Sequence, residues 1–212
     1  MELKSHAKLT ATLQTFIKLT IGITALAVLT GFYDYYTYST LPANVDPNEM
    51  ILPSDIVSGL VALVQLIVGV TTAILSLRWV YHSNKNLRAL SGESLEYTPG
   101  WAVGWFFIPI ANLFKPYRVM KEIWDVSHKN EASDHTRLKQ WWAFWILSTV
   151  VGRIALRRLM GAEDASSHAT SAIAFILSDG LDVIMNVLLL IVVTQIGKAY
   201  AQHIAALEHN AV

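Results

Sequence analysis

Three polar side chains interrupt the last apolar stretch of the chain at helical spacing. Asp179, Asp182 and Asn186 lie three and four residues apart, so they share one face of a helix. Two neighbouring carboxylates are the groups that general acid–base catalysis or a proton relay requires. Because an unpaired charge in hydrocarbon is costly, we expect these side chains to face protein rather than lipid.

Arginines on the preceding apolar stretch offer these carboxylates a partner. Arg153 and Arg157 are four residues apart and therefore also share a face. At 1.5 Å of helix per residue, Arg153 lies at a depth similar to that of Asp179 and Asp182. We therefore predict an ion pair between Arg153 and one of the two aspartates.

Two further residues complete the predicted intramembrane polar layer. Asp34 lies near the end of the first apolar stretch, where Arg157 or Arg158 could pair with it. Gln65 lies in the middle of the second stretch, where a side-chain amide needs a partner or a cavity. The layer comprises Asp34, Gln65, Arg153, Arg157, Asp179, Asp182 and Asn186.

The polar layer has three interpretations. A structural clamp is favoured, because the residues after Asn186 are almost entirely apolar as far as Thr194 and suggest no water-filled route. A path for protons or ions is the alternative. Acid–base catalysis is disfavoured, because a carboxylate bound to arginine stays ionised and is a poor acid.

Four apolar stretches position these groups. They cover about 17–38, 56–78, 138–158 and 172–195, each close to the ~20 residues that cross a bilayer. The chain is 53% hydrophobic and only 15% charged, more apolar than an average soluble domain. We expect an all-α integral membrane four-helix bundle, a single domain over 1–212, with Ser54 or Asp55 capping its second helix.

A shorter apolar segment lies between the second and third stretches. Residues 99–116 contain an apolar core of about 14 residues, which is typical of re-entrant or surface-lying elements. If this segment does not span, thirteen of the sixteen Lys and Arg residues lie on one side of the membrane; if it spans, the division is nine to seven. The positive-inside rule therefore favours four spans with both termini in the cytoplasm.

Several chemistries are not expected from this chain. It contains no cysteine, and its seven histidines lie outside the four stretches, so we predict no metal site and no cofactor. Hydrolase, phosphate-binding and nucleic-acid-binding motifs are not found. We do not expect an enzyme or a nucleic-acid partner.

The segment around 99–116 carries the residues of a recognisable motif, and here the chain resembles a bacterial membrane family, the domain of unknown function 4328 family. The resemblance implies a bacterial inner-membrane protein of unassigned role and supplies no catalytic residues. The motif residues are Trp79, Asn86, Pro99, Gly100, Trp101, Trp105, Pro109, Asn112, Pro116 and Tyr117.

The motif also predicts local structure. Pro109 lacks an amide hydrogen, so a helix that begins near Trp101 should end close to Ile108, and the Asn112 side chain could satisfy the freed carbonyls. Broken helices of this kind bind substrate in some transporters, which makes Pro109 and Asn112 candidates for a site. Residues 117–129 form an amphipathic helix that either binds lipid headgroups or a partner, or simply seals the bundle.

The sequence thus predicts a multi-pass membrane protein, non-enzymatic, that serves as a structural or partner-binding module. Its expected partners are the lipid bilayer, a second copy of the chain or another membrane protein. The alternative is a channel or transporter for a small solute or ion, using the polar layer and the broken helix.

Overall fold

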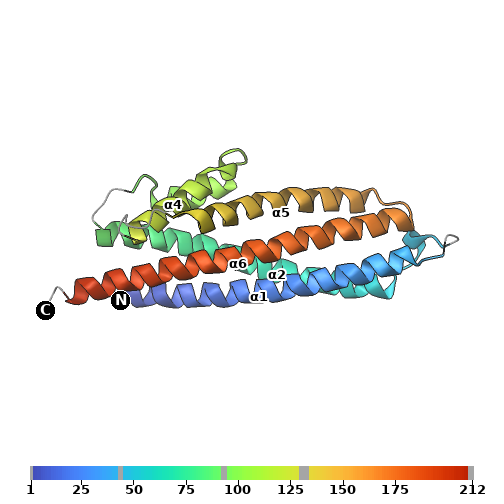
Figure 1. Cartoon of the computed structure of the whole chain (residues 1–212), viewed down its shortest axis with the longest axis horizontal. Coiled ribbons are helices and arrows are strands. Elements are labelled where there is room, and N and C mark those ends of the chain that lie inside the picture. Colours follow the sequence, from blue (N-terminus) through green and yellow to red (C-terminus); the bar gives the residue numbers. More distant parts are fainter. Residues whose placement is uncertain (1, 43–44, 92–94, 129–133, 210–212) are drawn as a thin grey trace. The chain divides into compact units, whose positions relative to one another are not determined.

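The structure, a computed structural model, describes residues 2–42, 45–91, 95–128 and 134–209, and every regular element in these ranges is helical (Figure 1). The four long helices are α1 (Glu2–Ser39), α2 (Pro53–Ser91), α5 (Thr136–Met160) and α6 (Ala165–His209). The short elements are η1 (Pro47–Glu49), α3 (Pro99–Gly104), η2 (Trp105–Phe107), η3 (Ala111–Leu113) and α4 (Lys115–Ser127). The all-α prediction is confirmed.

Three of the long helices have the length and apolarity of membrane spans. These stretches are His6–Ser39 in α1, Pro53–Ala89 in α2 and Ala165–Gln202 in α6. Helix α5 is not among them, because its arginines lower its mean hydropathy. The three apolar helices fit a membrane protein; the fourth span stays a prediction.

The chain divides into two compact units. Unit 1 contains Met1–Ile17, Thr71–Trp142 and Leu188–Val212, whereas unit 2 contains Lys18–Val70 and Ala143–Val187. All four long helices contribute residues to both units.

The core of unit 1 is built around the indole of Trp79. This side chain is 1% exposed, and its Nε1 donates a hydrogen bond to Thr10 Oγ1 at 3.0 Å. His6 lies beside it, with Nε2 3.0 Å from Ser83 Oγ and its ring 4.5 Å from the Tyr200 ring. Trp79, from the predicted motif, is thus a core residue that joins α1 to α2.

Polar side chains of unit 1 hold the chain in place before α3. Asn84 Nδ2 donates to the Tyr97 carbonyl at 2.9 Å, and Arg88 Nη2 donates to the same oxygen at 2.9 Å. From the other side, the Glu122 carboxylate of α4 accepts hydrogen bonds from the backbone amides of Glu96 and Tyr97. Asn86, also in the motif, is buried.

The helix breaks before Pro109, as its missing amide predicts. Helix α3 begins at Pro99 behind the cap Thr98 and passes into η2, after which Ile108 has the extended conformation favoured before proline. The backbone amide of Asn112, rather than its side chain, donates to the Ile108 carbonyl, at 2.7 Å. The Asn112 side-chain oxygen, an acceptor, is buried without a hydrogen-bonding partner in the described residues, and donation from Nδ2 to the freed carbonyls stays a prediction.

Helix α4 is the predicted amphipathic helix with shifted ends. It begins at Lys115, two residues before the predicted start, with Pro116 in its first turn, where a missing amide costs no hydrogen bond. It ends at Ser127, and residue 129 lies outside the described residues. Its apolar side, which includes Met120, Ile123 and Trp124, is buried within unit 1.

Glycines allow the helices of unit 2 to approach closely. A Cβ at Gly31 of α1 would lie 2.7 Å from Ile176 of α6. A Cβ at Gly152 of α5 would lie 3.0 Å from Ser178 Oγ, also of α6. A Cβ at Gly31 would require the Ile176 side chain to move, and one at Gly152 would press on the Ser178 hydroxyl. The absence of a side chain at both positions thus permits the observed packing against α6.

Helix α6 begins seven residues before the predicted stretch that starts at 172. Asp164 precedes its first turn and accepts hydrogen bonds from the backbone amide of Ser167 at 2.7 Å and from its hydroxyl at 2.6 Å. These bonds lower the pKa of the Asp164 carboxyl. An acidic cap of this kind stabilises a helix start.

Candidate functional site

A cavity of about 420 Å³ lies in unit 2 among α1, α2 and α6. Three of the sequence-predicted polar residues meet there, namely Asp34 from α1, Gln65 from α2 and Asp179 from α6. Asp55 supplies a third carboxylate, and none of the described lining residues is lysine or arginine. The rest of the wall is mainly small or apolar, with Ala62, Ala172 and Phe175 among its members.

Asp34 has one satisfied and one unsatisfied carboxylate oxygen. Its Oδ2 accepts a hydrogen bond from Ser58 Oγ at 2.6 Å. Its Oδ1 is buried and accepts no hydrogen bond of normal geometry within the described part of the chain, although the buried Ser54 hydroxyl lies close to this carboxylate. A buried acceptor without a donor is costly, so this oxygen is the position in the cavity that would gain most from a ligand.

Gln65 joins the three helices around the cavity. Its Nε2 donates to Asp179 Oδ1 at 3.0 Å and lies 3.4 Å from Thr24 Oγ1 on α1. The Gln65 amide, in the middle of α2, thus has a hydrogen-bonding partner and also lines a cavity. Asp179, in turn, has a neutral hydrogen-bond donor instead of the predicted arginine.

The outer wall of the cavity is formed by residues whose role the sequence did not reveal. The Tyr38 hydroxyl donates to Asp55 Oδ1 at 2.6 Å, and the Tyr38 ring stacks on His168 with centroids 4.7 Å apart. Asp55 Oδ2 accepts from the Leu52 amide at 2.9 Å, so Asp55 does cap α2. In the sequence, only its capping position pointed to a role for Asp55. No sequence pattern pointed to Tyr38 or His168.

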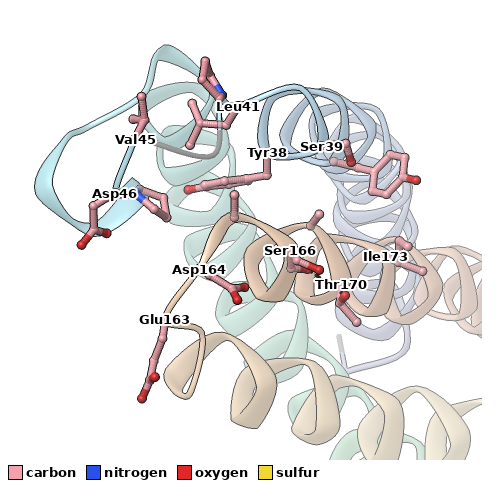
Figure 2. A pocket seen from close by; sticks show the side chains of 15 residues that line it. Tyr38, Ser39, Leu41, Val45, Asp46, Glu163, Asp164, Ser166, Thr170 and Ile173 are labelled. Atoms are coloured by element: carbon pink, nitrogen blue, oxygen red, sulfur yellow. Dashed lines mark hydrogen bonds between the residues drawn. The ribbon is translucent and has the colours of Figure 1, made fainter.

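A second, larger pocket of about 860 Å³ lies on the far side of Tyr38 (Figure 2). Tyr38 lines both this pocket and the cavity. Figure 2 shows its ring between Leu41 and the start of α6, with Asp46 and Glu163 at the edge of the pocket. Its described lining contains three acidic side chains and no basic one, so this pocket favours positive charge, whereas the cavity has His168 beside its three carboxylates.

The predicted ion pair of Arg153 is wrong. In the described residues no ion pair joins Arg153 to Asp179 or Asp182, or joins Arg157 or Arg158 to Asp34, and all three arginines are exposed.

The reason is the orientation of α5. Ser148, whose carbonyl lies 3.5 Å from Ser178 Oγ, shares a face with Gly152 and the fully buried Ala155, and this face contacts α6. At 100° per residue, Arg153 and Arg157 lie on the opposite side of the helix.

The remaining residues of the predicted layer do not line the cavity. Asn186 is buried, but its Nδ2 donates to the Asp182 carbonyl one turn earlier in the same helix, at 2.9 Å. Asp182 is half-buried beside Ser148. Of the three residues predicted to act together, Asp179, Asp182 and Asn186, only Asp179 lines the cavity.

The motif residues belong to unit 1 and contribute nothing to the cavity in unit 2. They are Trp79, Asn86, Pro99, Gly100, Trp101, Trp105, Pro109, Asn112, Pro116 and Tyr117. Two of them, Trp105 and Asn112, have a buried polar side-chain atom without a partner in the described residues. A ligand site at Pro109 and Asn112 stays a prediction.

A family model described as Domain of unknown function (DUF4328) matches residues 43–198. The chain belongs to this family. The match confirms the resemblance seen in the motif and covers α2 to α6 as far as Lys198, including Gln65, Asp55 and Asp179. Asp34 precedes the part that matches the DUF4328 family. No curated protein and no solved structure matches the chain.

The chemistry available to the cavity follows from its donors. The described residues include no group of three or more His, Asp or Glu side chains close enough to hold a metal ion. Asp55 and Asp179 already accept hydrogen bonds from the protein, whereas Asp34 retains a free acceptor. The arrangement can hold one positively charged hydrogen-bond donor against Asp34.

An ion pair of Asp179 with Arg153 and a hydrogen bond of Asp179 with Gln65 make opposite predictions for substitutions. Because Arg153 is exposed and has no acidic partner among the described residues, we expect Arg153→Ala to change the free energy of unfolding by less than about 0.5 kcal/mol. Gln65→Leu removes the donor from Asp179 and should cost about 0.6 to 1.7 kcal/mol, the range of interhelical hydrogen bonds in membrane proteins. Denaturation of both variants in detergent checks this; a larger loss for Arg153→Ala than for Gln65→Leu would restore the ion pair.

Proposed function

We propose that the chain is a non-enzymatic, multi-pass membrane protein that binds a small organic cation in the cavity of unit 2. The observation that carries this proposal is the buried Asp34 Oδ1, which has no donor in a cavity lined by two more carboxylates and, in its described lining, by no lysine or arginine. A cationic donor would satisfy this oxygen and offset the negative charge together.

The size and walls of the cavity favour an organic cation over a bare ion. A volume of about 420 Å³ falls in the range of small-molecule sites, which are mostly apolar with a few convergent polar groups. Tyr38 and Phe175 provide aromatic surface near the carboxylates, and aromatic faces attract ammonium groups. A protein that carries such a solute across the membrane would use the same site, so transport is the extension of this proposal.

The cation proposal predicts a ligand-dependent gain in stability that depends on Asp34. Methylammonium or putrescine chloride, whose ammonium groups donate hydrogen bonds, should raise the Tm of the purified protein relative to sodium chloride at equal ionic strength. At ten times the dissociation constant the gain is about 1.4 kcal/mol, or about 3 to 6 °C. Asp34→Asn keeps an acceptor for Ser58 and should fold, but it should lose the gain.

The matched control is Glu49→Gln, which neutralises an exposed carboxylate that lines neither hollow. This variant should respond to the cations as the wild-type chain does. An equal Tm shift in wild type and Asp34→Asn, or no shift beyond that of sodium chloride, would refute the cavity as a cation site.

We also propose the topology that the charges favour, with four spans, both termini in the cytoplasm of a bacterial cell and residues 99–116 re-entrant or surface-lying in its inner membrane. The cysteine-free chain permits a direct test. A cysteine at Asn48, which is exposed, should react with a membrane-impermeant maleimide in intact cells, whereas one at Ala132 should react only after the cells are opened. Reaction at 132 in intact cells would overturn this topology.

A partner-binding role is the second candidate, and the exposure of α2 favours it. Only 6% of the most apolar window of α2 is buried, against 28% for the windows of α1 and α6. Leu60, Leu63 and Leu66 are among its exposed side chains, available to lipid or to another helix.

Self-association through α2 predicts more than one chain per particle. Single cysteines at Leu63 or Leu66 should form disulfide-linked dimers in membranes, whereas one at Leu156 of α5, which is exposed to a similar degree, should not. A detergent-solubilised mass of one chain, together with equal cross-linking at all three sites, would leave lipid as the neighbour of α2.

A further inference from the structure

The broken segment between α2 and α4 presents a patch of exposed apolar side chains. Phe107 and Ile110 are 71% and 77% exposed, and they flank Pro109 at the turn where the helix is interrupted. The members of this patch, which we name the wedge, are Trp101, Phe107, Ile108, Ile110, Leu113 and Phe114.

The inner side of the same segment is packed, so the wedge has a defined orientation within unit 1. Ala102 and Ala111 are buried, and the elements α3, η2, η3 and α4 contact one another. Apolar side chains that are exposed on an otherwise packed surface mark an interaction site.

The backbone of the wedge is suited to an environment without water. The amide of Trp105 donates to Trp101, that of Asn112 to Ile108, and that of Phe114 to Ala111, while Pro109 has no amide hydrogen to satisfy. Irregular backbone is tolerated in lipid only when its polar groups have internal partners.

A hydrogen bond indicates how deep the wedge would lie. Trp142 Nε1 of α5 donates to the Leu113 carbonyl at 3.0 Å. Trp142 is four residues, or about 6 Å of helix, inside the start of the predicted apolar stretch at 138. Leu113 therefore lies at the depth of the boundary between headgroups and acyl chains, where tryptophan is enriched.

Cationic side chains border the wedge at its base. The Arg118 guanidinium is exposed and lies 5.8 Å from the centre of the Phe114 ring. Lys115 Nζ lies 5.0 Å from the Trp105 ring and 5.1 Å from the Tyr97 ring. Positive charge next to exposed apolar surface complements a lipid, whose phosphate lies next to its acyl chains.

We propose that the wedge inserts into one leaflet of the membrane and that Arg118 binds the phosphate of an anionic lipid there. This inference rests on the membrane location of the chain and is independent of the cavity in unit 2. A shallow insertion of about 5–10 Å is the depth at which amphipathic elements bind a bilayer surface. The insertion makes residues 99–114 an interfacial anchor rather than a substrate site.

A spin label at position 110 tests the insertion in the full-length chain. Ile110→Cys in the cysteine-free protein, labelled and reconstituted in phosphatidylcholine vesicles with one-quarter phosphatidylglycerol, should collide more with oxygen than with a soluble nickel chelate. Leu177→Cys, exposed on the apolar part of α6, is the lipid-facing control, and Glu96→Cys, on an exposed charged residue, is the aqueous one.

The outcomes of this experiment are distinct. An oxygen preference at 110 that is smaller than at 177 supports shallow insertion. A nickel preference like that at 96 places the wedge in water and overturns the proposal. Low collision with both reagents would mean that a protein surface covers the wedge, and this also overturns it.

Substitution of Arg118 tests the lipid phosphate. The oxygen preference at 110 should be at least twofold greater in the mixed vesicles than in phosphatidylcholine alone, and Arg118→Gln should remove this difference. Lys121→Gln, whose ammonium is paired with Asp125 at 3.0 Å, should retain it. Reproduction of the difference by inorganic phosphate, or equal preference in both vesicles for the unsubstituted chain, would exclude an anionic lipid.

Discussion

The carboxylates of unit 2 govern its arrangement, because a charged group in an apolar helix must find a donor, a cation or water. Asp179 accepts a hydrogen bond from the Gln65 side-chain amide. Asp55 accepts hydrogen bonds from the Tyr38 hydroxyl and the Leu52 backbone amide. In the described residues, only one carboxylate oxygen of Asp34 accepts a hydrogen bond, from the Ser58 hydroxyl. The glycine at 31 lets α1 and α6 come close enough for these groups to surround one cavity. The unsatisfied Asp34 oxygen distinguishes this cavity from a simple packing defect.

The same constraint acts on the backbone in unit 1. A helix break exposes amides and carbonyls, and in the segment from Pro99 to Phe114 short local hydrogen bonds and a proline account for many of them. The apolar side chains can then lie on the outside. Arg88, Asn84 and Glu122 hold the entrance of this segment by hydrogen bonds to residues 95–97. The result is a rigid apolar turn on a polar base.

The helices and the break at Pro109 could be predicted from the sequence, because apolar length and the missing proline amide are local properties. The orientation of α5 could not. Arg153 and Arg157 share a helical face, but so do Ser148, Gly152 and Ala155, and spacing alone does not say which face packs. The small residues decide it, because they permit the close approach to Ser178. Arg153 and Arg157 are left exposed on the other face.

The cavity is lined by residues from two parts of the chain, one inside the region that matches the family model and one before it. Gln65, Asp55 and Asp179 lie within residues 43–198, whereas Asp34, Gly31 and Tyr38 lie on α1, before the match. The hydrogen-bonded framework therefore comes largely from the family region, and the free acceptor comes from α1. The matched region alone would contain Asp55 and Asp179, but it would lack both Asp34 and Tyr38, whose hydroxyl donates to Asp55. The acceptor on which the cation proposal rests is thus contributed by α1, next to the framework of α2 and α6.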